Sequence, residues 1–174
     1  MHESAATTLD WVRNFVVAHD LCPFAAHPLA RGRVTAVACP EREPEGCFYW
    51  AGARGQEFLD QPPGLVETTL LVFPHALAGF GDFLDFVATY EDFLNESGAD
   101  ALLQLAHFHP AYRFADAPPD DPAHATNRAP YPTLQLLRTD SVARAVAAYG
   151  DTDRIWQRNA ALLRARPELA RPTP

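Results

Sequence analysis

Two largely apolar runs that each end at a proline constrain the fold of this chain more than any other feature of its sequence. The run 68–73 is followed by Pro74, and the run 101–109 is followed by Pro110. Large apolar and β-branched residues favour strands, and proline cannot donate a hydrogen bond to a continuing ladder. We therefore predict a strand in each run, and the β-branched segment from Val34 to Cys39 predicts another.

Amphipathic segments with helical spacing lie between and after these runs. They predict four helices: from Thr7 or Thr8 to about His19, from Phe83 to near Gly98, from Ser141 or Asp140 to Gly150, and from Asp151 or Thr152 to about Arg164. Three other segments have less regular patterns. They are expected to be an excursion with at most one strand over 40–64, a long loop over 110–133 and a short helical segment over 134–138.

Strands separated by helices, in a chain of 174 residues, predict one α+β domain. We expect a small, mostly antiparallel sheet that packs against several helices on one side. The domain is predicted to span residues 1–166, and the Pro-rich tail 167–174 is predicted to be frayed.

The charged residues exclude several classes of function. The formal net charge is −8, and nucleic-acid binding needs a basic face, so no nucleic-acid partner is expected. All 14 basic residues are arginines. Without a lysine amine the chain cannot form a Schiff base, attach pyridoxal phosphate or build the phosphate-binding Gly-Lys-Ser/Thr loop.

The apolar segments and the cysteines indicate the compartment. No apolar run approaches the roughly 20 residues that a membrane span needs, and the N-terminus lacks the pattern of a signal peptide. A cytoplasmic protein with no membrane partner is therefore expected. In that reducing compartment Cys22, Cys39 and Cys47 are predicted to be free thiols, buried small residues or ligands.

Four short clusters carry side chains that could do chemistry. Cys22 directly precedes Pro23 after the first expected helix, so its thiol is a candidate nucleophile, soft metal ligand or buried structural residue. His107 and His109 are separated by one residue on an expected strand, which places both imidazoles on one face. They are candidates for one metal site or for a base and its orienting partner, and the alternative is one exposed and one hydrogen-bonded histidine.

The long loop holds the third cluster, in which Asp120, Asp121 and His124 lie among prolines. Asp121 and His124 could join His107 and His109 in a metal site with an open coordination position. The alternative is that Asp120 and Asp121 make turn hydrogen bonds only.

The fourth cluster, also in the long loop, is Thr-Asn-Arg-Ala-Pro-Tyr-Pro. Arg128 could bind a substrate carboxylate with two hydrogen bonds, and Tyr131 could donate a hydrogen bond or a proton. Asn127 and Tyr112 are further candidate substrate contacts. The alternative is a rigid loop in which Arg128 and Asn127 bind neighbouring carbonyl groups.

The same clusters carry a resemblance to a known family. The chain resembles a family of bacterial proteins catalogued as domain of unknown function 1415, and the resemblance spans nearly its whole length. It is carried by Leu-Cys-Pro-Phe-Ala at 21–25, Leu-Leu-Val-Phe-Pro at 70–74, Phe-His-Pro at 108–110 and Thr-Asn-Arg-Ala-Pro-Tyr-Pro at 126–132. The resemblance implies no particular activity.

Four positions depart from the pattern that the family usually shows. His107 replaces a serine, and His124 replaces a polar residue that is not histidine. Gln135 replaces a histidine, and Thr139 replaces a glutamate. The resemblance therefore favours four residues as the candidates for a general role: Cys22, His109, Arg128 and Tyr131.

The leading hypothesis is an enzyme that acts on a small polar metabolite with a carboxylate group, at a metal centre built around His109. Imidazole and carboxylate ligands suit iron, which is favoured and implies oxidative chemistry, or zinc, which implies hydrolysis. A haem held by His109 or Cys22 is a further alternative. In this hypothesis Arg128 anchors the substrate carboxylate and Tyr131 assists proton transfer.

Two other hypotheses need no metal. In one, a hydrolase or transferase, Cys22 attacks as a thiolate, His109 acts as its base and Arg128 stabilises the developing charge. In the other, the rigid loop 118–132 binds a metabolite or a protein partner without catalysis. The sequence leaves the oligomeric state open.

Overall fold

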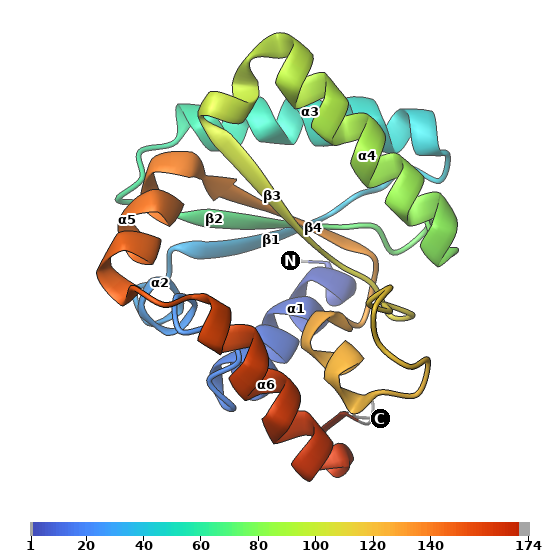
Figure 1. Cartoon of the computed structure of the whole chain (residues 1–174). Helices are drawn as coiled ribbons and strands as arrows, with labels where there is room; N and C mark the ends of the chain where they lie inside the picture. Colours follow the sequence, from blue (N-terminus) through green and yellow to red (C-terminus); the bar gives the residue numbers. More distant parts are fainter. Residues whose placement is uncertain (1, 171–174) are drawn as a thin grey trace.

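A four-stranded sheet lies at the centre of the computed structural model, which describes residues 2–170 (Figure 1). β1 and β2 are parallel, whereas β4 pairs antiparallel with both β2 and β3. The sheet is therefore mostly antiparallel, and the predicted α+β class is confirmed. The strands are β1 (Val34–Ala38), β2 (Thr68–Val72), β3 (Leu103–Phe108) and β4 (Thr133–Arg138), in the order β1-β2-β4-β3 across the sheet.

Two long helices, α3 (Pro44–Asp60) and α4 (Phe80–Ser97), cover one face of the sheet (Figure 1). Side chains alternate along a strand, so every second residue points to this face. Leu71 of β2 and Leu134 and Leu136 of β4 are fully buried there. The α4 side chains that complete this core recur at helical spacing: Phe83, Phe86, Val87, Tyr90 and Leu94.

Helices also lie on the opposite face, so the expectation that they cover the sheet on one side is wrong (Figure 1). α1 packs on this face, where its Leu9 joins Ala36 and Leu70 of the sheet in a second, smaller core. Both faces need cover because every residue of β2 is buried. The helices on this side are α1 (Glu3–Trp11), continued by a π-helical segment (Val12–Val17), α2 (Ala26–Ala30), α5 (Thr139–Tyr149) and α6 (Asp153–Ala165).

The segment expected to be an irregular excursion contains the helix α3, which corrects the interpretation of residues 40–64. Pro44 begins this helix. The N–H groups of the first turn have no acceptor within a helix, so the missing N–H of proline costs no hydrogen bond there. Gly55 serves packing, because a β-carbon there would lie 2.9 Å from the Tyr90 hydroxyl. That hydroxyl donates a 3.1 Å hydrogen bond to the Ala51 carbonyl, which ties α4 to α3.

The segment expected to be a short helix is the strand β4. It pairs with β2 on one side and β3 on the other, so all of its backbone is within a ladder. Leu134 and Leu136 point to the core under α3 and α4, whereas Gln135 and Leu137 point to the opposite face. Pairing with two neighbours outweighs the helix propensity of leucine and glutamine in so short a segment.

The ends of two helices are set by their caps. α1 begins earlier than expected because the His2 imidazole accepts a hydrogen bond from Ser4 N–H. α4 ends as expected at Gly98, whose φ of +73° is the left-handed conformation of a capping glycine.

Residues 2–170 also contain three short 3₁₀ segments, and the first of them, Ala99–Ala101, follows α4. Pro122–Asn127 lies within the expected long loop, and Pro167–Ala170 follows α6. The rest of the tail that was expected to be frayed, 171–174, lies outside the described residues. No helix within residues 2–170 is long and apolar enough to span a membrane.

Candidate functional site

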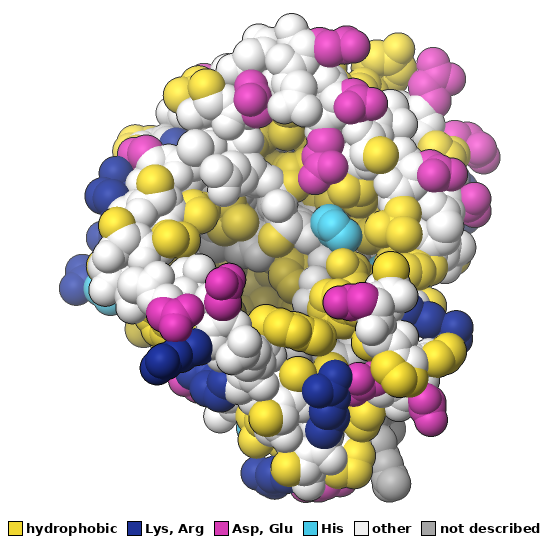
Figure 2. Space-filling model, in the orientation of Figure 1, with side chains coloured by type: hydrophobic (Ala, Val, Ile, Leu, Met, Phe, Trp, Pro, Cys, Tyr) yellow, Lys and Arg dark blue, Asp and Glu magenta, His cyan; other side chains and the backbone are white. Residues whose placement is uncertain are grey.

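A cavity of about 550 Å³ lies on the face of the sheet opposite α3 and α4. Figure 2 shows it as a hollow lined by hydrophobic side chains in the middle of one surface. The strands supply its floor, and the surrounding walls come from the π-helical segment, the chain at 21–28, α5 and α6. The apolar strand residues on the floor are Val34, Leu70, Ala106, Phe108 and Leu137.

The cavity exists because α5 does not pack on the sheet. Val142, Ala145 and Val146 form an apolar stripe on this helix, and all three line the cavity. No residue of α5 is buried, and Val146 is 38% exposed. An amphipathic helix normally buries its apolar stripe against the core, so here an open space takes the place of that contact.

α6, in contrast, is fixed to the rest of the molecule at two places. Asn159 donates a 2.6 Å hydrogen bond to the Leu21 carbonyl. Arg164 forms an ion pair with Asp121 at 2.7 Å. α5 joins this fixed helix through Gly150, whose φ of +89° is accessible mainly to glycine.

Aromatic pairs surround the cavity. Trp11 contacts Phe108 edge-to-face, with ring centroids 5.3 Å apart. Phe114 and Trp156 are paired in the same way at 4.7 Å. Such pairs are large and apolar, so they give the cavity aromatic walls.

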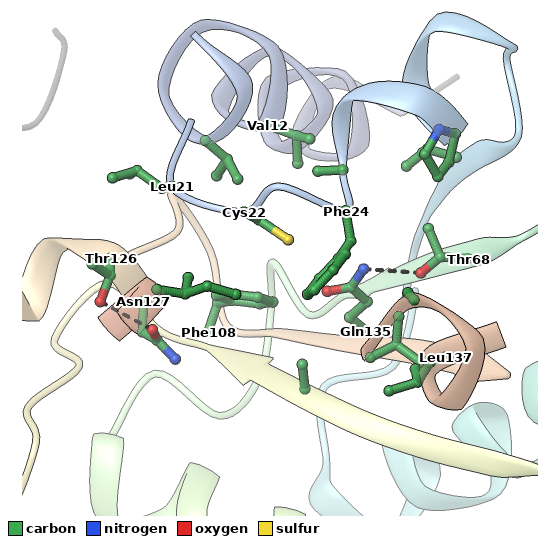
Figure 3. A pocket seen from close by; sticks show the side chains of 18 of the residues that line it. Val12, Leu21, Cys22, Phe24, Thr68, Phe108, Thr126, Asn127, Gln135 and Leu137 are labelled. Carbon is green, nitrogen blue, oxygen red and sulfur yellow. Dashed lines mark hydrogen bonds between the residues drawn. The ribbon is translucent and has the colours of Figure 1, made fainter. Parts of the chain in front are cut away.

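Cys22 points its sulfur into the cavity (Figure 3). Sequence reasoning placed it at a helix C-terminus, but α2 begins only four residues later, and the backbone N–H groups of Phe24 and Ala25 act to lower the pKa of the thiol. Burial nevertheless raises the pKa of Cys22, and the two N–H groups offset only part of that rise. The thiol is accessible from the cavity and is mainly protonated near neutral pH.

The cavity floor carries the amide of Gln135, a residue that sequence reasoning did not include among the site residues. Its Nε2 donates a 3.0 Å hydrogen bond to the Thr68 hydroxyl, which donates in turn to the Leu136 carbonyl at 2.8 Å. The signal in the sequence was a lone amide in the apolar run Thr-Leu-Gln-Leu-Leu. That signal has a meaning only once the segment is known to be a strand with one face on the cavity.

His107 and His109 share one face of the β3 segment as predicted, since both rings contact Phe83 of α4. This face is opposite the cavity. His109 Nδ1 accepts from Ala111 N–H at 3.0 Å, so its Nε2 carries the proton and donates to the Leu77 carbonyl at 3.1 Å. Both nitrogens are thus engaged by the backbone, and the structure does not bring His109 and the Cys22 thiol together.

His124 is engaged in the same way. Its Nδ1 accepts from Phe114 N–H at 3.1 Å, and its Nε2 lies 2.7 Å from the Pro118 carbonyl. Asp121 accepts from Ala123 N–H, in addition to its ion pair with Arg164. The Arg164 guanidinium lowers the pKa of Asp121 to about 2.

The predicted metal ligands therefore do not form a cluster. Within residues 2–170, no three His, Cys, Asp or Glu side chains are grouped so that they could hold a metal ion. His109 and His124 have no free nitrogen lone pair, because each already accepts a backbone hydrogen bond at Nδ1 and donates from Nε2. The proposed iron, zinc or haem centre at His109 does not fit these side chains as they are arranged.

The polar loop residues lie mostly outside the cavity. Arg128 Nε donates to the Tyr112 carbonyl at 3.1 Å, and neither residue lines the cavity. Tyr131 does not line it either. Asn127 does, but its Nδ2 donates to the His107 carbonyl at 3.3 Å, so its amide holds the loop against β3.

Comparison with known proteins gives a family and no activity. A family model described as a protein of unknown function (DUF1415) matches residues 3–170, and the chain belongs to this family. No curated protein and no solved structure matches the chain.

Proposed function

We propose that this member of the family binds a small, largely apolar molecule in the cavity between the sheet and α5. The observation that carries the proposal is the unpacked apolar stripe of α5, which faces about 550 Å³ of open space. Ligand sites typically have volumes of about 300–1,000 Å³ and mainly apolar walls. A ligand here would complete the contact that α5 does not make with the sheet.

The cavity walls favour binding over catalysis. Among residues 2–170 they include no histidine and one carboxylate, that of Glu67, which lies 3.9 Å from the guanidinium of Arg33. A nucleophilic thiol needs a nearby base or a lowered pKa, and Cys22 has neither. This supports the third hypothesis drawn from the sequence, a binding protein, but at the cavity and not at the loop 118–132.

A neutral fluorescent probe tests the proposal directly. N-phenylnaphthylamine becomes brighter in apolar surroundings, and its 17 heavy atoms at about 0.3 kcal/mol each predict a dissociation constant of about 0.2 mM or below. The blocking variant is Ala145→Trp, which places an indole in the cavity. The matched control is Ala147→Trp, on the exposed side of the same helix.

We expect the probe to bind saturably to the wild type and to Ala147→Trp with equal affinity. Ala145→Trp should bind at least about tenfold more weakly, because its indole occupies the space of the probe. Unchanged binding in Ala145→Trp, or a lack of saturable binding in the wild type, would contradict the proposal.

A further inference from the structure

The floor of the cavity presents a hydrogen-bond acceptor in a fixed orientation. A carbonyl oxygen can only accept, so the Thr68 hydroxyl uses its single proton on the Leu136 carbonyl. Its oxygen must then accept from the amide, which assigns Nε2 of Gln135 to the side of Thr68. The carbonyl Oε1 of Gln135 is consequently turned away from Thr68, and Figure 3 shows it directed into the cavity.

The cavity offers no charge to a ligand. Of the lining residues in the described part of the chain, two are charged, Glu67 and Arg138, and each already contacts a protein group. Glu67 lies beside Arg33. Nη2 of Arg138 donates to the Phe58 and Gln61 carbonyls at 2.7 and 2.6 Å. An ionised ligand group would therefore be buried without a partner, which is strongly unfavourable.

From these two observations we infer that the ligand is neutral and carries a hydrogen-bond donor, an O–H or N–H, at its buried end. Gln135 Oε1 accepts that donor, and Thr68 is a positioning residue that holds the amide. The inference rests on the proposed function and specifies its ligand class. It differs from the carboxylate-bearing metabolite expected from the sequence, for which Arg128 was the anchor, because Arg128 does not reach the cavity.

Three probes of matched shape test this ligand class. para-Phenylphenol has the donor, its methyl ether lacks the donor, and para-phenylbenzoate carries a negative charge. Each is measured by displacement of N-phenylnaphthylamine at about pH 7, where the phenol is neutral. The proteins compared are the wild type, Gln135→Met, which keeps the length of the side chain and removes the acceptor, and Gln104→Met, a control at an exposed position outside the cavity.

We expect the wild type to bind the phenol about fivefold more tightly than the ether, as one neutral hydrogen bond predicts. Gln135→Met should abolish this preference without weakening the ether, and Gln104→Met should retain it. Thr68→Val should reduce the preference, because the amide is no longer held. The benzoate should bind at least about tenfold more weakly than the phenol.

Equal binding of phenol and ether to the wild type, or a preference that survives in Gln135→Met, would overturn the inference and leave the proposed function intact. Tight binding of the benzoate would overturn the claim that the ligand is neutral. Failure of the fluorescent probe itself to bind would contradict the proposed function instead, so the two failures are distinguishable.

Discussion

Filling the cavity should stabilise this protein, whereas the same substitution in its packed core should destabilise it. Ala106 lies on β3, opposite Gln135 in the ladder, and lines the cavity. Ala51 of α3 is 0% exposed in the core on the other face. Both positions can be changed from alanine to leucine, which adds three carbon atoms in each case.

The magnitudes follow from burial and packing. Each buried methylene contributes about 0.8 kcal/mol, so complete burial in the cavity would give about 2.4 kcal/mol. The leucine loses about 0.5–1 kcal/mol of rotamer freedom and stays partly accessible, which leaves about 1 kcal/mol for Ala106→Leu. Ala51→Leu has no space to enter, and overpacking of this kind costs about 1–3 kcal/mol.

Urea unfolding measures both effects, because a shift of the midpoint with an unchanged slope reports a change in stability. Ala106→Leu should raise the midpoint and weaken binding of N-phenylnaphthylamine. Ala51→Leu should lower the midpoint and leave probe binding unchanged. If Ala106→Leu destabilised the protein as much as Ala51→Leu, the space above β3 would be filled by protein atoms in solution, and the reasoning would be refuted.

Two further predictions concern the thiols and the ion pair of α6. N-ethylmaleimide should modify Cys22 alone in the folded protein, because Cys39 and Cys47 are 1% and 0% exposed. The reaction should be slow near pH 7 and faster as pH rises, because burial raises the pKa of Cys22. Mass spectrometry that found Cys39 or Cys47 modified first would refute this prediction. Asp121→Asn should destabilise the protein by about 1 kcal/mol near pH 7, a value reduced because Arg164 is half exposed. The pKa of Asp121 in the folded protein is about 2, below its ordinary value. The stabilisation by its ion pair with Arg164 is therefore present above about pH 4 and is lost as pH falls toward 2. If the stability difference between the wild type and Asp121→Asn stayed constant over that range, the ion pair would not be its source.

The elements that sequence reasoning predicted well have strong local signals. The strand β2 is a run of β-branched and large apolar residues stopped by Pro74, and α4 shows apolar spacing up to Gly98. In both, local preference agrees with the final environment. A local pattern is then sufficient to identify the element.

The elements that it missed depend on contacts between distant residues. Gly55 lowers the helix propensity of α3, yet it is the residue that lets the Tyr90 hydroxyl approach. β4 is stabilised by its ladders with β2 and β3, which are remote in the sequence. Neither the contact between Gly55 and Tyr90 nor the pairing of β4 can be recognised from the local sequence of residues 44–60 or 133–138.

The candidate site was predicted only in part. Cys22 and Asn127 were singled out from the sequence, and both line the cavity. His109 and His124 are conspicuous by residue type, but their nitrogens hold backbone loops in place. The cavity itself arises from the gap between α5 and the sheet, a tertiary feature that no spacing of residues reveals.

The most direct test of the binding site is a crystal structure of the protein with N-phenylnaphthylamine. We predict density for the probe between the sheet and α5, in contact with Phe108 and Val142, and with its N–H directed to Gln135. α5 packed directly on Leu137, with the cavity closed and the probe elsewhere, would contradict the account.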